Sequence, residues 1–159
     1  MAVMLVRVLG REQEALGAKL QAPFSDTGWA CDYIGWLYSQ KLVMGVSDTE
    51  FGGDEPASAY DYATLLLRSL GYSDKSGDFR WETATAMCQS LGILSDKIYA
   101  KGLEDFTRGD MVLMTLQALM TNRKDSSELL LTYLTGQGAV NSVLASDWSD
   151  EYQSLGIFK

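Results

Sequence analysis

The chain has 159 residues, of which 47% are hydrophobic and 21% charged, a composition typical of a globular domain and not of a disordered segment. Thirteen Lys and Arg stand against 21 Asp and Glu, and the resulting net charge of -8 argues against nucleic acid and anionic lipid as partners. The chain has no histidine, which removes the commonest metal ligand and the commonest general base.

The first segment, MAVMLVRVLGREQEALG, has the pattern of one half of a helical hairpin. It lacks a basic stretch ahead of its apolar residues, so it does not have the pattern of a secretory signal peptide. No apolar run in the chain has the length of a membrane span. We expect the chain to begin inside a structural unit, with residues 1–21 as the C-terminal helix of a truncated first repeat.

Three segments of the chain end alike and indicate an internal repeat. They are LVRVLG (5–10), LLRSLG (66–71) and LQALMT (116–121). Each places apolar residues at helical spacing, and the alignment puts Leu9, Leu70 and Leu119 at one position of the repeat. The repeating unit is about 50 residues long, which lies within the range of helical repeat arrays.

Each later repeat also has an earlier half, which predicts a unit of helix, loop and helix. The second repeat has an amphipathic pattern over residues 29–45 and a Gly- and Pro-containing loop over 46–58. The third has the corresponding pattern over 81–94 and a loop over 95–107. We therefore expect a second repeat at 22–73 and a third at 74–122.

The remaining residues, 123–159, are expected to form a C-terminal helical extension. The stretch SSELLLTYLTGQGAVNSVL predicts one or two helices, and Ser126 or Ser127 is a suitable cap for the first. The polar and aromatic tail that follows has no clear pattern.

Helix-loop-helix units cannot cover their own apolar faces, so the units must stack and share a core. The sequence therefore predicts a mainly all-α fold. Methionine and aromatic residues are interpreted as filling for this core and not as a cofactor site. The obvious core candidates are Tyr33, Ile34, Leu37, Leu65, Leu66, Leu70, Met87, Leu91, Leu113, Met114 and Leu116.

The two cysteines, Cys31 and Cys88, are not spaced as metal ligands. Both lie among apolar residues on predicted helices, so we expect two buried free thiols. A disulfide between them is the alternative. No cofactor and no metal site is predicted.

The order of short motifs resembles the S-layer homology (SLH) family. The repeat of that family reads approximately F-x-D, W-A, Y-I, G-I, a loop with F and P, and T-R-A-E opening a helix that ends in L-G. The second repeat carries Phe24-Ser25-Asp26, Trp29-Ala30, Tyr33-Ile34, Leu37, Gly45, Phe51, Pro56 and Leu70-Gly71. The third carries Phe79, Gly92-Ile93, Phe106 and Thr107-Arg108-Gly109-Asp110.

The resemblance implies an SLH-like pseudo-threefold helical bundle that anchors a surface protein without catalysis. Its implied partner is an anionic, pyruvylated secondary polysaccharide of the Gram-positive cell wall, which implies an extracellular location. Other surface-protein domains are further candidate partners. The main ligand contact of the family is the Arg of T-R-A-E, which here is Arg108. In the second repeat Ala59 stands at the equivalent position, so that groove has lost its cation.

The candidate ligand-binding residues are Arg108, Thr107, Asp110, Trp29 and Trp81. Thr107 and Asp110 also fit a helix cap, and core packing is the alternative for the two tryptophans. A cation at a helix N-terminus opposes the helix dipole, so Arg108 needs an anionic ligand or an acidic neighbour.

Glu104 and Asp105 are the neighbours that the sequence offers to Arg108 for an ion pair. The tripeptide Arg-Gly-Asp at 108–110 is expected inside the first helical turn. It is therefore not expected at the tip of a mobile loop, where an adhesion signal would have to lie.

Two other functions remain as alternatives. One is a structural or protein-interaction domain of the same fold without glycan affinity. The more distant one is an enzyme that uses acidic residues, although no paired-carboxylate, phosphate-binding or nucleophile motif is present. The acidic loop with Asp48, Glu50, Asp54 and Glu55 does not have the spacing of a calcium-binding loop and is interpreted as a solvated surface.

Overall fold

The computed structural model describes residues 1–54 and 56–155, and the all-α prediction is confirmed for this part of the chain. Its only extended pairing there is a bridge between Asn122 and Leu129. Three short 3-10 turns cover Gly28–Ala30, Trp81–Thr83 and Leu103–Asp105. The α-helices are α1 (Ala2–Val8), α2 (Glu12–Ala18), α3 (Cys31–Ser39), α4 (Ala59–Ser69), α5 (Ala84–Ser90), α6 (Asp96–Lys101), α7 (Arg108–Leu119), α8 (Leu130–Gly136) and α9 (Ser142–Leu155).

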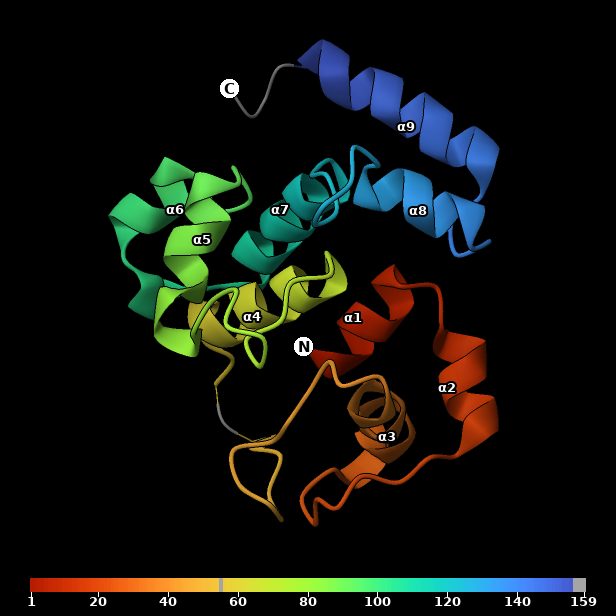
Figure 1. Ribbon diagram of the computed structural model, residues 1–159, viewed down its shortest axis with the longest axis vertical. Coiled ribbons are helices and arrows are strands. Elements are labelled where there is room, and N and C mark those ends of the chain that lie inside the picture. Colours follow the sequence, from red (N-terminus) through yellow and green to blue (C-terminus); the bar gives the residue numbers. More distant parts are fainter. Residues whose placement is uncertain (55, 156–159) are drawn as a thin grey trace.

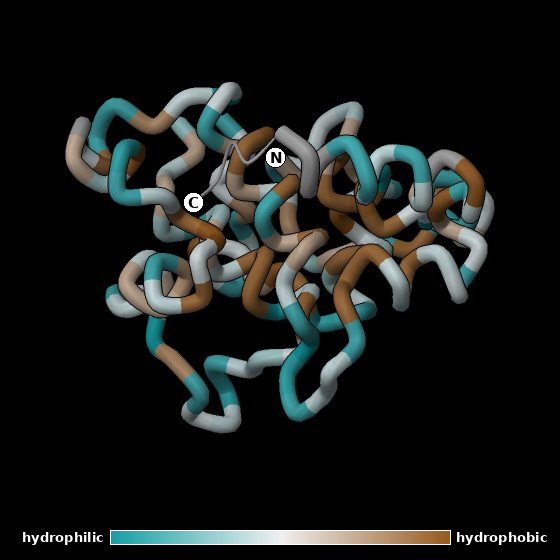
Figure 2. Tube along the Cα trace, turned by 90° about the horizontal axis from the view of Figure 1, so that it is seen from above, coloured by the Kyte–Doolittle hydropathy of each residue, from teal (hydrophilic) through white to brown (hydrophobic). Residues whose placement is uncertain are grey.

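Three helices, α1, α4 and α7, run in the same general direction through the middle of the molecule (Figure 1). Their inward residues are almost fully buried and include Val6, Leu66, Leu67 and Met114. The outer helices cover this layer, with α3 against α1 and α2, and α5 against α4. Hydrophobic stretches gather in the middle, and the projecting loops are mostly hydrophilic (Figure 2). The shared core that the repeat pattern requires is therefore present.

The Leu-Gly pairs at the ends of α1 and α4 stop these helices by the same backbone change. Gly10 and Gly71 have φ angles of +65° and +96°, which L-residues with a side chain rarely adopt. Gly10 also lies against the C-terminal region, because a Cβ added to it would be 2.3 Å from the Cβ of Ala139. A glycine at position 10 thus allows both the turn after α1 and the close contact with Ala139.

The segment after α7 belongs to the same core. Leu130 and Leu134 of α8 are buried among the residues of the central helices. The Arg11 side chain also reaches Gln137 at the end of α8, at 3.3 Å. Two helices follow residue 122, within the predicted range, and α9 packs against α8. The predicted serine cap is wrong, because α8 begins at Leu130 after the uncapped Leu129.

The helix boundaries differ from the predicted ones in both outer halves. The pattern over 29–45 becomes a 3-10 turn and then α3, which ends at Ser39. The predicted loop 95–107 contains α6, whose N-cap Ser95 accepts a hydrogen bond from the Ile98 N–H. This charged segment was predicted as a loop because Gly102 interrupts it, but Ser95 caps a helix that ends just before that glycine.

The core prediction is wrong at Leu113, which is 38% exposed on α7. The Leu113 side chain lies on the outer face of α7, because Met111 and Met114 occupy the face that points to the core. Met87, Leu91 and Leu116 are half-buried, and the other predicted core residues are buried.

The expectation of two buried thiols is wrong for Cys31. Both cysteines are free, but Cys31 is exposed and only Cys88 is buried. Cys31 is the first residue of α3, and its side chain lies beside that of Asp32 and outside the core.

Candidate functional site

Two helix starts, those of α4 and α7, are built in the same way. In α7 the Thr107 N–H donates to the Asp110 carboxylate at 2.7 Å, and the Asp110 N–H donates to the Thr107 hydroxyl at 3.3 Å. In α4, Ser58 and Asp61 form the same reciprocal capping box. The two boxes occupy positions 49 residues apart in the sequence. Thr107 and Asp110 therefore have a structural role at the start of α7.

The residue that this cap does not use is Arg108. It is exposed, and within residues 1–54 and 56–155 its side chain makes no hydrogen bond or ion pair. Glu104 and Asp105, the predicted acidic neighbours, are exposed and do not pair with it. The charge of Arg108 therefore has no compensation from the described part of the chain.

A second positive charge, that of the Met1 α-amino group, lies near Arg108. Burial first, and then the charge of Arg108, lower the pKa of the Met1 α-amino group, which places Arg108 near the start of α1. The N-terminal end of α7 adds the partial positive charge of the helix dipole. Gly109 has no side chain to obstruct the helix start, where a Cβ would meet only the Thr107 hydroxyl, at 3.5 Å. An anion can therefore approach both the guanidinium and the first turn of α7.

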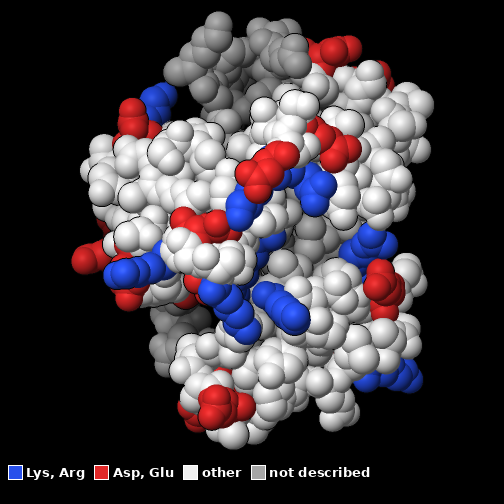
Figure 3. Space-filling model, viewed as in Figure 1, with Lys and Arg blue, Asp and Glu red and all other residues white. Residues whose placement is uncertain are grey.

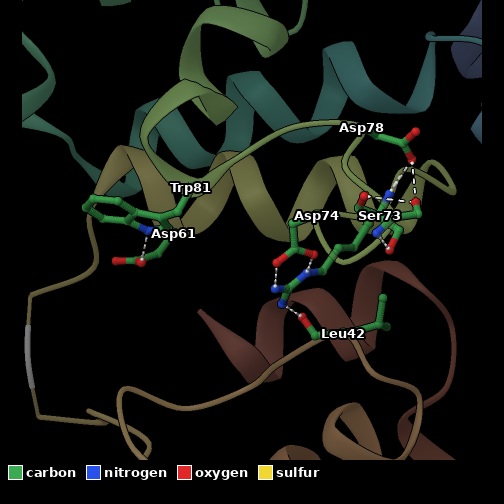
Figure 4. A network of polar contacts seen from close by, with 8 residues as sticks. Leu42, Asp61, Ser73, Asp74, Asp78 and Trp81 are labelled. Carbon is green, nitrogen blue, oxygen red and sulfur yellow. Dashed lines mark hydrogen bonds and ion pairs between the residues drawn. The ribbon is translucent and has the colours of Figure 1, made fainter.

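Trp81 covers the other helix start, that of α4. Its indole N–H donates to the Asp61 carboxylate at 2.9 Å (Figure 4). The centroid of its ring lies 4.9 Å from that of the Tyr60 ring. The side chain remains 48% exposed, so one part of the ring faces solvent. Ala59 is fully buried at the position equivalent to Arg108. This second site consequently offers an aromatic face without a cation.

Trp29 lies in the 3-10 turn ahead of α3, as Trp81 lies in the 3-10 turn ahead of α5, and is 83% exposed. Nearby Asp26 fixes the loop beside it by accepting hydrogen bonds from the backbone N–H groups of Phe51, Gly52 and Gly53, at 2.6, 2.7 and 3.2 Å. The bond from Phe51 is the largest cause that lowers the pKa of Asp26. Core packing, the alternative for both tryptophans, does not apply to Trp29 and applies to Trp81 only in part.

Asp78 is a structural residue that the sequence interpretation missed. It precedes Trp81 by three positions, as Asp26 precedes Trp29. Its carboxylate accepts the Ser73 N–H at 2.8 Å and the Lys124 ammonium at 2.7 Å (Figure 4). The shared D-x-x-W spacing was the signal that would have found it.

A second ion pair lies beside this one. Arg68 donates to both oxygens of Asp74, at 3.0 and 2.7 Å, and to the Leu42 carbonyl oxygen at 2.7 Å (Figure 4). Hydrogen bonds from Arg68 are the first cause that lowers the pKa of Asp74. This pair joins the end of α4 to the loops around it.

The structure brings Thr107, Arg108 and Asp110 together and places the tryptophans elsewhere. Trp81 belongs to the α4 start and Trp29 to the α3 start, and neither makes a hydrogen bond or cation–π contact with Arg108. Within the described ranges, no group of three Cys, Asp or Glu residues is arranged to hold a metal ion. None of the helices in those ranges has the length and apolar character to cross a bilayer.

Residues 25–58 match the family model of the S-layer homology domain. This finding confirms the resemblance seen in the motifs of the second repeat. The matched segment contains Asp26, Trp29 and α3, and it ends at Ser58, the cap of α4. No curated protein and no solved structure shows a significant match to the chain.

The match supports a general role for the chain. S-layer homology domains are non-catalytic binding modules that attach proteins to the cell surface and cell wall, so the matched segment implies cell-wall association in that broad sense. Arg108 lies outside the matched segment, and its role depends on the geometry of the α7 start.

Proposed function

We propose that this chain is a cell-surface anchoring module that binds an anionic, pyruvylated secondary polysaccharide of the cell wall through Arg108. One observation carries the proposal: an exposed arginine without a partner in the described ranges stands at the capped start of a 12-residue helix. The family match supports the anchoring role, and the chemistry of this position supports an anionic ligand.

The chemistry of a pyruvyl group fits this position. Such a group carries a carboxylate, and a guanidinium binds a carboxylate with two parallel hydrogen bonds. The partial positive charge at the start of α7 strengthens that interaction. Thr107 and Asp110 bind each other and hold the backbone that carries Arg108, so they position the arginine.

The exposed tryptophans suit a polymer better than a single sugar. Trp29 and Trp81 present flat faces at two further helix starts, and aromatic faces bind the apolar faces of sugar rings. Stacking of a sugar ring on either tryptophan would add contacts beyond the charged group on Arg108. The proposed location is accordingly extracellular, on a Gram-positive cell wall, where other surface-protein domains are further partners.

A second candidate function is a scaffold of the same fold without glycan affinity. The α4 start favours it, because Ala59 replaces the arginine there and Trp81 is already bonded to Asp61. In this second function, Arg108 at the start of α7 would bind no glycan.

Sedimentation with purified cell wall decides between the two functions. The protein is mixed with wall that carries pyruvylated polymer and with the same wall after removal of the pyruvyl groups. We expect the protein to sediment with the first wall only, and Arg108→Gln to abolish this. Lys97→Gln removes an exposed charge in α6, which carries none of the proposed binding residues, and should sediment normally. Equal sedimentation with both walls, or full binding by the Arg108 variant, would refute anchoring through Arg108.

A further inference from the structure

A cleft of about 320 Å³ lies at the end of the central helices opposite to Arg108. Arg108 is at the first turn of α7, near the start of α1. Leu9 and Gly71, which line the cleft, lie one and two residues after the ends of α1 and α4. Residues of α2, α3 and α8 complete its walls. Its volume lies at the lower end of the range for small-molecule sites.

The walls of this cleft are basic in a chain that is acidic overall. Three arginines, Arg11, Arg68 and Arg123, line it, against one carboxylate, that of Glu14. They come from three distant segments, which follow α1, lie within α4 and follow α7. Lys and Arg side chains gather around a hollow in the middle of the face shown in Figure 3. Each of the three arginines also has a carboxylate partner, Glu14, Asp74 or Glu128, so the strength of these ion pairs decides how much charge is available to a ligand.

The guanidinium of Arg123 is oriented by stacking on Tyr133 and has only a long ion pair with Glu128. Its guanidinium lies 3.6 Å from the centroid of the Tyr133 ring, a stacking distance that fixes its plane. Its Nε is buried and has no hydrogen-bond partner. Its contact with the Glu128 carboxylate is long, at 3.5 Å, and both side chains are partly exposed. Because Nε is closed to solvent, the donors left for an anion are those of the two terminal Nη groups, of which one has only the long contact with Glu128.

Arg11 faces the same space with equally loose bonds. Its two contacts, with Glu14 and Gln137, are both 3.3 Å long. Glu14 is also bonded to the indole N–H of Trp36, at 3.1 Å, so this carboxylate already has a second partner. Charge-assisted hydrogen bonds to an anion are normally about 2.7–2.9 Å long. An anionic ligand that replaces the longer contacts of Arg11 would therefore form stronger hydrogen bonds.

Arg68 differs from the other two because its donors are committed. It bonds both oxygens of Asp74 and the Leu42 carbonyl oxygen, and its side chain is only 12% exposed. It therefore fixes the wall of the cleft and is not expected to bond a ligand directly.

From these contacts we propose a second site, in which Arg11 and Arg123 bind a small oxyanion, a carboxylate or a phosphate monoester, between Trp36 and Tyr133. This site is separate from the α7 start and does not depend on the anchoring function. The cleft admits a ligand of about the size of one sugar or amino acid and not a folded partner.

Titration calorimetry at constant ionic strength tests the site, with inorganic phosphate in one arm and malonate in the other. We expect saturable binding of at least one probe, and the arm that binds identifies the ligand class. Arg123→Met and Arg11→Gln should each weaken this binding by about tenfold or more, which is the loss of one charge-assisted contact. Arg11→Gln changes a partly exposed side chain, so it keeps the test valid even if Arg123→Met impairs folding.

The control variants separate this site from general charge effects, and all titrations use the Arg108→Gln background, which removes anion binding at the α7 start. Lys97→Gln and Arg80→Gln remove the same charge outside the cleft and should leave the affinity for the probe unchanged. The proposal is overturned if neither probe binds saturably. It is also overturned if the control variants weaken binding as much as Arg11→Gln, because binding would then reflect overall charge.

Discussion

Lys124 lies 2.7 Å from both carboxylate oxygens of Asp78 and so ties the segment after α7 to the loop before α5. Asp78→Asn and Lys124→Met should each lower the melting temperature, because each leaves one charge without its partner. The double variant should lose less stability than the sum of the two single losses, because all three variants remove the same interaction. Thermal unfolding of the four proteins checks this, and strict additivity would show that the pair contributes nothing.

Acid should destabilise the protein through Asp26, Asp74 and Asp78. Their native hydrogen bonds lower the pKa of each carboxyl group, so near pH 4 the unfolded chain binds more protons than the folded one. Their stabilising effect is complete above the pKa of the unfolded chain and is lost as the pH falls through the lower pKa of the folded one. Urea unfolding between pH 6 and pH 3 measures this loss.

Asp26→Asn should flatten the acid branch of that pH profile. Asp48→Asn is the matched control, because Asp48 is exposed and accepts no hydrogen bond from the described part of the chain. An equal change of slope in the two variants would contradict a special role of Asp26.

Core packing predicts unequal effects of two leucines in the central helices. Leu66→Ala should lower the free energy of unfolding by about 2–5 kcal/mol, since Leu66 is 1% exposed and its removal leaves a cavity. Leu113→Ala should cost about 1 kcal/mol or less, because Leu113 faces outward. Chemical denaturation compares the two, and similar losses would refute the assigned orientation of α7.

The capping role of Thr107 has its own test. Thr107→Ala should lower the free energy of unfolding by about 1 kcal/mol, as the loss of an N-cap hydroxyl usually does. Thr132→Ala, in an exposed position on α8, should have little effect. Glycan binding should weaken less in Thr107→Ala than in Arg108→Gln, because the cap only positions the arginine.

The two thiols should differ sharply in reactivity. A thiol reagent should modify Cys31 rapidly in the native protein, because that residue is exposed. Cys88 should react only after unfolding, since burial excludes the reagent and raises its pKa to about 12. A count of one fast thiol in buffer and two in denaturant checks the prediction. Two fast thiols in buffer would mean that the core around Cys88 opens readily.

The sequence predicted the features that depend on local patterns. The all-α fold follows from helical spacing, and the capping box of Thr107 and Asp110 follows from three-residue spacing at a helix start. The S-layer homology resemblance followed from the order of motifs, and the match over residues 25–58 confirms it. The division into repeats and the binding role of the site residues stay predictions.

What the sequence did not reveal depends on distant segments meeting in the fold. The partner of Asp78 is 46 residues away at Lys124, and the three cleft arginines come from three different helices or loops. The exposure of Cys31 depends on which face of α3 packs against the core. The apolar residues around Cys31 in the sequence do not determine that face. No local pattern encodes such juxtapositions, because they arise only when the helices pack.

The contact between Gly10 and Ala139 has a consequence for the order in which the protein can fold. The ribosome makes α1 and α2 before the residues that cover their connecting turn, and Gln137, which Arg11 contacts, lies 126 positions later in the sequence. Non-local contacts of this kind slow folding and leave apolar surface open in the growing chain. The closing step of folding must therefore wait for α8, and a chain interrupted before Leu130 would keep that apolar surface available to chaperones or to aggregation.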